Sequence, residues 1–389
     1  MIKTASIFAQ VLSLINRRKF SLSVSELKAE KGAKGFRCWE HLVCMLFCHL
    51  ASADSLREIC GGLASSIGKM IHLGIKGMPK RSTLSYANNH RPWQLFENVF
   101  YQLLSEADTL AAKQKRRFRF KNPLVSIDSS TIDLCLSMYD WAKFRRAKGA
   151  VKLHLMLNHQ GYLPSWALIT TGKVHDVKVA QKLEFAPETV VVMDRAYVDY
   201  EMFDKWTDND VWFVTRAKDN MDYRVVKNRD LPNRGNVISD QEILLTGYYS
   251  RQKLKYKLRR IVVWDKENER EIVLLTNHMK FAASTIGRIY KERWQIELFF
   301  KAIKQNLKIK TFVGTSENAV KIQIWTALIS ILLLKILQIR SKIGWSLSNL
   351  SAMLRFNLLS YRQLWVWLDK PYQNPALAPP DGQLLLFGN

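Results

Sequence analysis

The run Thr189–Met193 limits the possible fold of this chain more than any other feature. Three consecutive valines lie inside it, and β-branched side chains favour a strand. A strand that is apolar at every position has to be covered on both faces, which is typical of a parallel or mixed sheet with helices on each side. The run therefore predicts an α/β fold, and it ends at an acid, Asp194.

The neighbouring segments predict the rest of a mixed sheet with flanking helices. Short apolar runs are separated by turn residues, and Asn158–Gly161 is typical of a hairpin turn. The predicted elements, in chain order, are strands at 124–128, 151–157 and 163–170, a helix from Asp176 to before Pro187, the strand at 189–193, a helix at 199–207 and a strand at 211–215. This order, βββαβαβ, indicates one α/β domain.

The first part of the chain predicts helices, near residues 5–16, 39–50, 55–72 and 92–108. Between the last two, the segment Lys80–Ser85 could present a short recognition element to DNA. A helix start that uses Ser82 or Thr83 as its cap explains the segment equally well. The sequence leaves both interpretations open.

Cysteines and histidines cluster in one N-terminal segment, which raises the question of a zinc site. They lie within an apolar helical pattern, where cysteine behaves as a small hydrophobic residue, and no CxxC pair supports metal binding. A buried helix is therefore the favoured interpretation. The residues concerned are Cys38, His41, Cys44, Cys48 and His49.

The chain has 59 basic and 34 acidic residues, a formal charge of +25. This excess favours a polyanionic partner, nucleic acid before an anionic membrane. The most apolar segment, Ile322–Leu334, is too short to span a bilayer and predicts a buried helix. Five cysteines, an odd number, and no visible secretory signal favour the cytoplasm.

The segment Tyr290–Lys310 predicts one helix with a charged face beside an apolar face, at about 100° of rotation per residue. Glu297 is the one acid on the charged face. A carboxylate among cations suits a metal ion held beside phosphates, although an ordinary salt bridge is the alternative. The charged face comprises Tyr290, Arg293, Glu297, Lys301, Lys304 and Lys308, and the apolar face Ile289, Ile296, Phe299, Ile303 and Leu307.

Residues 217–279 predict strands without a helix. Within them, basic residues alternate with apolar ones from Arg251 to Arg260, so a single strand would carry five cations on one face. A surface that follows DNA phosphates is favoured over an exposed edge protected by charge. The five cations are Arg251, Lys253, Lys255, Lys257 and Arg259.

Asp128 and Asp194 each follow an apolar strand, and the C-terminal ends of such strands meet at one edge of a sheet. With Glu297 on a helix packed against that sheet, three acids can converge. Carboxylates suit Mg²⁺ or Mn²⁺, and two such ions would serve in-line attack on a phosphodiester. Each acid also has an ordinary explanation, as a turn, a cap or a salt bridge. Asp133, Asp140 and Asp176 are competing acids.

Taken together, these residues resemble the DDE triad of bacterial insertion-sequence transposases with a ribonuclease-H-like core. The spacing Tyr290-x2-Arg293-x3-Glu297-x6-Lys304 is similar to the YREK signature of the subgroup with a β-rich insertion before its last acid. The motif Asp194–Tyr197 resembles the one around the second aspartate of that family. His175–Asp176 resembles a recurring pair, in which we expect Asp176 to cap a helix and His175 to have a supporting role.

This resemblance implies an α/β fold with a ribonuclease-H-like mixed sheet, flanking helices and an N-terminal helical domain. A β-rich insertion would precede the last catalytic helix. The implied regions are a DNA-binding helical region at 1–115, a catalytic core at 116–216 and 280–345, the insertion at 217–279, and a C-terminal helical region with a loose tail at 346–389.

The resemblance also implies a function. Asp128, Asp194 and Glu297 would be catalytic and would bind two Mg²⁺ or Mn²⁺ ions, cleaving and joining DNA by cut-and-paste transposition, with a hairpin intermediate as one route. Partners would be double-stranded DNA, comprising terminal inverted repeats and target, and a second copy of the chain. Alternatives are another ribonuclease-H-like nuclease and a non-catalytic DNA-binding protein. The expected DNA contacts are Tyr290, Arg293, Lys304, and Trp294 if it is not a core residue.

Overall fold

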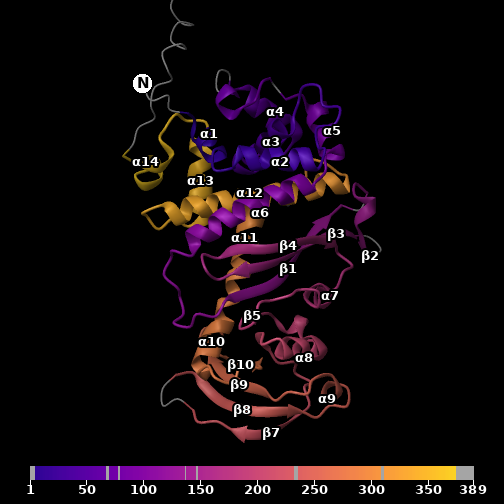
Figure 1. The fold of residues 1–389 in the computed structure, drawn as a ribbon, viewed down its shortest axis with the longest axis vertical. Coiled ribbons are helices and arrows are strands. Elements are labelled where there is room, and N and C mark those ends of the chain that lie inside the picture. The colour runs from indigo at the N-terminus through magenta and orange to yellow at the C-terminus, as the bar shows by residue number, and fades with distance from the viewer. Residues whose placement is uncertain are drawn as a thin grey trace, which may run out of the picture.

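The computed structural model describes residues 5–66, 70–77, 79–135, 137–145, 148–231, 235–307 and 311–373. Three tiers follow one another along its longest axis (Figure 1). Helices from both ends of the chain form the first tier, the central strands form the second, and the strands of the insertion form the third. Lys308 and most of the predicted tail lie outside the described residues.

The helical tier is assembled around one long apolar helix, α12 (Glu317–Arg340). By length and composition α12 could cross a membrane, but almost all of its side chains from Ala319 to Leu337 are buried inside the protein. The buried helix predicted at 322–334 is therefore confirmed. Around α12 lie α1 (Ile7–Leu12), α2 (Arg17–Glu26), α3 (Cys38–Leu50), α4 (Leu56–Ala64), the 3₁₀ turn η1 (Met70–Leu73), α5 (Arg81–His90), α6 (Gln94–Ala111), α13 (Leu347–Asn357) and α14 (Leu364–Asp369).

Helix α3 decides the question of zinc. Every residue of α3 is buried, His41 Nε2 is hydrogen-bonded to Asn88 Oδ1 at 2.7 Å, and His49 Nε2 to Thr326 Oγ1 at 3.0 Å. In the described part of the chain, no group of three His, Cys, Asp or Glu side chains is arranged to hold a metal ion. These histidines and cysteines belong to the core.

The central sheet has the predicted order of elements. Strands β1 (Leu124–Leu134), β3 (Lys148–Asn158) and β4 (Leu163–Thr171) form an antiparallel meander. Strands β5 (Val190–Val192) and β6 (Trp212–Arg216) run parallel to β1 on its other side. The spatial order β4-β3-β1-β5-β6 confirms the expected ribonuclease-H-like mixed sheet. Connecting these strands are β2 (Lys143–Arg145), α7 (Asp176–Ala180), the 3₁₀ turn η3 (Arg195–Tyr197) and α8 (Tyr200–Asp208).

The strands of the insertion extend this sheet instead of forming a separate one. Strand β10 (Arg270–Thr276) pairs antiparallel with β6, and the order then continues through β9 and β8 to β7, to give ten strands in all. Helices α10 (Ala283–Glu292) and α11 (Trp294–Asn306) return the chain to the helical tier (Figure 1). The remaining insertion elements are β7 (Tyr223–Asn228), β8 (Val237–Leu245), α9 (Ser250–Lys253) and β9 (Leu258–Asp265).

Several predicted boundaries were wrong. Helix α2 was not predicted, because its hydroxyl-rich sequence has a weak apolar pattern. The helix expected over 55–72 comprises α4 and, after residues that the structure does not describe, the turn η1. The helix expected from Asp176 to before Pro187 ends already at Ala180.

The alternating cations of the insertion do not share one strand face, so that prediction was wrong. Residues 250–253 form helix α9, and β9 begins only at Leu258. Lys253 lies 3.7 Å from the carboxylate of Glu201, and the backbone N–H of Lys255 donates to Asp204. The conformation of this segment depends on contacts with helix α8. The alternation of basic and apolar residues in the sequence does not indicate those contacts. A role in DNA binding for Arg251, Lys253, Lys255 and Lys257 remains a prediction.

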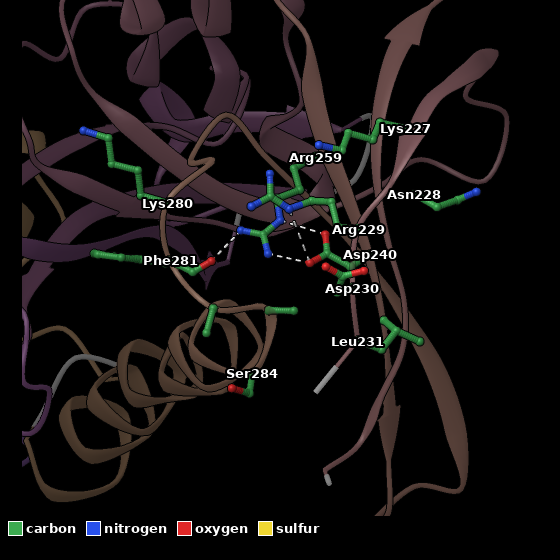
Figure 2. A pocket seen from close by; sticks show the side chains of 12 residues that line it. Lys227, Asn228, Arg229, Asp230, Leu231, Asp240, Arg259, Lys280, Phe281 and Ser284 are labelled. Atoms are coloured by element: carbon green, nitrogen blue, oxygen red, sulfur yellow. Dashed lines mark hydrogen bonds and ion pairs between the residues drawn. The ribbon is translucent and has the colours of Figure 1, made fainter. Parts of the chain in front are cut away.

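Arg259 points inward, with a side chain that is only 2 % exposed. Its Nε and Nη2 form two bonds with the carboxylate of Asp240, at 2.8 and 2.5 Å. Figure 2 shows Arg229 approaching the same carboxylate and Arg259 reaching the carbonyl oxygen of Phe281, just before α10. Arg259 therefore ties β8 and β9 to the start of α10 and is not a surface cation.

Candidate active site

The register of the parallel strands places two of the predicted acids side by side. The pairing of β1 with β5 ends at Ser126 opposite Val192, and Asp128 and Asp194 each follow two residues later. Because parallel strands keep a common register, these aspartates emerge at the same level of the sheet. Asp194 lies just beyond β5, where its carboxylate accepts a hydrogen bond from the backbone N–H of Ala196 at 2.7 Å.

Asp128 does not end its strand, contrary to prediction. Strand β1 continues to Leu134, because β3 pairs with it along its whole length, with Asp128 opposite Leu155. Side chains alternate between the two faces of a strand, so the competing acid Asp133, five residues further on, points to the opposite face. Asp133 and Asp140 are both exposed.

The third predicted acid, Glu297, lies in the first turn of α11. The predicted single helix is two helices, because the hydrogen-bond ladder shifts at Arg293, whose backbone N–H donates to Tyr290 and whose carbonyl accepts from Ile296. Arg293 keeps helical φ and ψ of −52° and −33°, so α10 and α11 lie end to end (Figure 1). The predicted apolar face is buried, and its residues are Ile289, Ile296, Phe299, Ile303 and Leu307.

The guanidinium of Arg293 brings two of these carboxylates together. Its Nη2 lies 2.5 Å from Glu297 Oε1, and its Nη1 lies 3.8 Å from Asp128 Oδ2. The Arg293 side chain is 15 % exposed, so water screens these charges only weakly. The ordinary salt bridge considered for Glu297 does exist, with Arg293 at the start of the same helix. The contact of Arg293 with Asp128 is what joins β1 to α11.

The pKa of the Asp128 carboxyl group depends on its burial and on the charges around it. Burial raises the pKa of its carboxyl to about 7, and the hydrogen bond from the backbone N–H of Ser129 opposes that rise. The charges of Asp194 and Glu297 raise this pKa further, whereas Arg293 lowers it. The three acids from three different elements therefore share one electrostatic environment.

An open cleft of about 360 Å³ adjoins this group. Asp128 and Glu297 line it together with Lys301 and Lys304, and the ammonium of Lys304 donates to the carbonyl oxygen of Thr131 at 3.1 Å. The cleft thus presents carboxylates and cations side by side. This combination suits a substrate that carries phosphates next to bound cations.

Tyr290 and Trp294 lie on either side of Arg293. The Arg293 guanidinium lies 5.8 Å from the centre of the Tyr290 ring, which is half-buried. Trp294 is 54 % exposed, so the interpretation of Trp294 as a core residue was wrong. An exposed indole on this helix can stack on a base.

Residues around Asp176 form a polar network that the sequence did not reveal. Asp176 does not cap α7 as predicted, since His175 occupies that position without a side-chain cap bond. Instead, Asp176 Oδ1 accepts hydrogen bonds from Ser129 Oγ at 2.7 Å and Lys152 Nζ at 3.1 Å. Ser129 directly follows Asp128, so the network supports the backbone that presents this acid. The one sign of this network in the sequence was the position of Ser129 next to Asp128.

Comparison with known proteins agrees with this geometry. A family model described as a transposase DDE domain matches residues 119–333, and a domain of unknown function (DUF4372) matches residues 3–76. The chain is 32 % identical over 286 residues to the "Probable transposase for insertion sequence element IS5377" of Geobacillus stearothermophilus, which covers 72 % of this chain and 74 % of that relative.

Two further similarities are more distant. A Sinorhizobium fredii protein named as a transposase, y4zB, is 29 % identical over 305 residues, 78 % of this chain and 84 % of its own. The structure of a piggyBac transposase synaptic complex with hairpin DNA aligns over 95 % of this chain and 81 % of that chain, at 11 % identity and a TM-score of 0.41, too low to argue from. On the family model, which covers more than half of its length, and on its insertion-sequence relatives, this chain belongs to the DDE transposase family of DNA-processing enzymes.

Proposed function

We propose that this transposase cuts and joins DNA at the ends of its insertion sequence, with Asp128, Asp194 and Glu297 as its catalytic acids. The observation that carries the proposal is the joining of β1 and α11 through Arg293, together with the register that aligns Asp194 with Asp128. Asp128 and Glu297 line one cleft together with lysines, and the charge of Asp194 acts on Asp128 from the end of the neighbouring strand.

The donor set fits the divalent metal that the DDE family implies. Carboxylate oxygens are the ligands that Mg²⁺ and Mn²⁺ prefer, and the raised pKa of Asp128 reflects a buried carboxyl that other acids repel. As they stand, no three acidic, histidine or cysteine side chains of the described residues are placed to hold an ion. Arg293 lies between two of these acids, so we propose that it leaves Glu297 when metal and DNA enter.

Two bound ions would lower the pKa of an attacking water and stabilise the leaving oxygen. The chain's own residues orient the DNA. Arg293, once released, reaches a phosphate next to the scissile bond, and Lys304, about two turns beyond Glu297 on α11, holds the strand. Trp294 stacks on a base at the end of the element. The 3′-hydroxyl freed by hydrolysis then attacks a second phosphodiester, and when that bond is on the opposite strand the product is a DNA hairpin.

Joining two ends also requires two active sites, so we propose that the chain acts as a dimer on double-stranded DNA in the bacterial cytoplasm. The excess of basic over acidic residues supports binding to both the terminal repeats and the target. Light scattering of the protein with and without a terminal-repeat duplex tests the dimer. A mass that corresponds to one chain per duplex at all concentrations would contradict it.

Alanine at residue 128, 194 or 297 should abolish cleavage of a terminal-repeat duplex in Mg²⁺, because each change removes one metal ligand, while DNA binding stays within about threefold. Asp133→Ala is the matched control, because that acid lies on the same strand but faces away. Denaturing gels separate nicked, double-cut and hairpin products. Undiminished cleavage by any of the three variants would remove that acid from the site, and a wild-type protein that binds without cleaving would favour a non-catalytic DNA-binding role.

A further inference from the structure

Helix α5 presents a continuous polar stripe to solvent. Its exposed or half-exposed residues recur at helical spacing, two per turn, and the helix has no acid in its first turn. The opposite face is buried through Leu84, Ala87 and Asn88. The stripe, which we call the α5 face, consists of Arg81, Ser82, Ser85, Tyr86, Asn89 and His90.

The start of α5 excludes one of the two interpretations of this segment. Lys80 occupies the N-cap position and no side chain caps the helix. The expected capping role of Ser82 or Thr83 was therefore wrong. Ser82 lies in the first turn with an exposed side chain, where a hydroxyl can contact a partner.

Hydrogen bonds hold the other end of α5 rigidly. The buried Asn88 is bonded to His41 of α3 at 2.7 Å, and Asn318 of α12 donates to the carbonyl oxygens of Asn88 and Arg91 at 2.8 and 2.7 Å. Ser316 donates to the Asn89 side chain at 2.7 Å. Such hydrogen bonds suit a recognition surface, because side chains that are already ordered lose less conformational entropy on binding.

The electrostatics of this region favour a polyanion. No Asp or Glu occurs from Ile59 to Phe96, a stretch that contains the exposed Lys76, Lys80 and Arg81. A groove of about 490 Å³ beside α5 is lined by Arg57 and Arg81, with Asp54 as its one acid. The nearby Glu58 is bonded to the start of its own helix, α4.

We propose that the α5 face reads base edges in the major groove of the element's terminal repeat. The inference rests on the proposed function and names the surface that recognises its DNA. Arginine pairs with guanine, asparagine with adenine, and serine with either. The major groove, roughly 12 Å wide, admits an α-helix, whose diameter with side chains is about 10–12 Å. The ten residues of α5 make a helix about 15 Å long. Tyr86 is the one large apolar side chain on this face, whereas protein interfaces have a more apolar centre.

The test separates reading of bases from attraction to phosphates. The measured quantity is the ratio of the Kd for a scrambled duplex to the Kd for the terminal-repeat duplex. Arg81→Lys keeps the charge but loses the two-pronged guanidinium. We expect this ratio to fall about fivefold or more, with unchanged affinity for scrambled DNA and an unchanged salt slope. Arg18→Lys, at an exposed position on α2, is the matched control and should change neither.

A second measurement locates the contact on the DNA. Each guanine of the repeat is replaced in turn by 7-deazaguanine, which lacks the N7 acceptor. At one guanine, the replacement should weaken binding of the wild-type protein but should not weaken binding of Arg81→Lys any further. In the same way, 7-deazaadenine at one adenine should weaken binding of the wild-type protein but not that of Asn89→Ala. An unchanged ratio in Arg81→Lys, Ser85→Ala and Asn89→Ala would overturn the inference and favour a protein partner. A wild-type ratio of one would also overturn it.

Failure of this inference can be told apart from failure of the catalytic proposal. Asp128→Asn should keep the full binding ratio while losing cleavage. Arg81→Lys should lose nicking of the terminal-repeat duplex only in proportion to its weaker binding of that repeat, so that saturating protein restores nicking. A variant of α5 that loses nicking but keeps the binding ratio would contradict the separation of reading from chemistry.

Discussion

At the scale of single residues, the pKa of the Asp128 carboxyl group reflects the burial and the charges of the candidate site. This group is buried beside two other acids and one arginine, and its pKa is about 7. An aspartate in an unfolded chain has a pKa of about 3.9. The folded protein therefore binds the proton more tightly than the unfolded chain does.

The sign of the pH dependence follows from this difference. Protonated Asp128 stabilises the fold below about pH 4, and this contribution is lost as the pH rises from about 4 to about 7. Asp128→Asn removes the titrating group, so its free energy of unfolding relative to wild type should be roughly 1–4 kcal/mol higher at pH 8 than at pH 5. Urea denaturation in EDTA measures it, with the exposed Asp133→Asn as control. The same difference at both pH values would contradict the raised pKa.

At the scale of elements, the insertion supports helices α10 and α11 from a distance. The buried pair of Arg259 and Asp240 joins β9 to β8, and Arg259 also donates to carbonyl oxygens at His278 and Phe281. These carbonyls precede α10, which leads directly to Arg293 and Glu297. Figure 2 shows this convergence beside the start of α10.

Asp240→Ala should therefore destabilise the protein by about 3–5 kcal/mol, because it leaves the Arg259 charge buried without its carboxylate. Glu242→Ala is the control, since the pair of Glu242 with Arg229 is partly exposed and should be worth less than about 1 kcal/mol. Thermal or urea unfolding of both variants measures the difference. Equal, small effects would mean that this pair does not support α10.

At the scale of the whole molecule, the site depends on parts of the chain far apart in sequence. The acids come from β1, from the loop after β5 and from α11, and five strands of the sheet, β6 to β10, lie in the chain between the second and third acids. An ion bound by all three would tie the central sheet to the helix that returns from the insertion. Binding to the native state alone stabilises it by mass action.

Mn²⁺ at about 100 times its Kd should raise the unfolding midpoint of the wild-type protein by about 3 °C, as expected for about 2.7 kcal/mol of stabilisation in a chain of 389 residues. EDTA should reverse the shift, and Glu297→Gln should abolish it, because the amide is a poorer ligand. Asp133→Ala should keep it. A shift of equal size in Glu297→Gln would show that the ion binds elsewhere.

Local patterns in the sequence determined the elements of the core. The apolar run at 189–193, the hairpin around Asn158 and the apolar face of the last catalytic helix each depend on residues that are close in the chain. Period, turn residues and strand ends are local properties, so they predicted the order of the strands and the candidate acids. The residues of the YREK-like spacing each lie within about two helical turns of Glu297, so this spacing is also visible in the sequence.

Only the tertiary structure decided which charged groups meet. The alternating cations at 251–259 look alike in sequence, yet Arg259 is buried because Asp240 binds it from a diagonal position on the neighbouring strand β8. The sequence predicts Asp176 as a helix cap, but in the fold Ser129 of β1 and Lys152 of β3 donate hydrogen bonds to it. Burial and long-range pairing depend on contacts between segments that are distant in the chain. The periodicity and spacing of residues in the sequence do not predict such contacts. The sequence alone determined the strands and the acids, and the packing of sheet against helix decided how those acids are held.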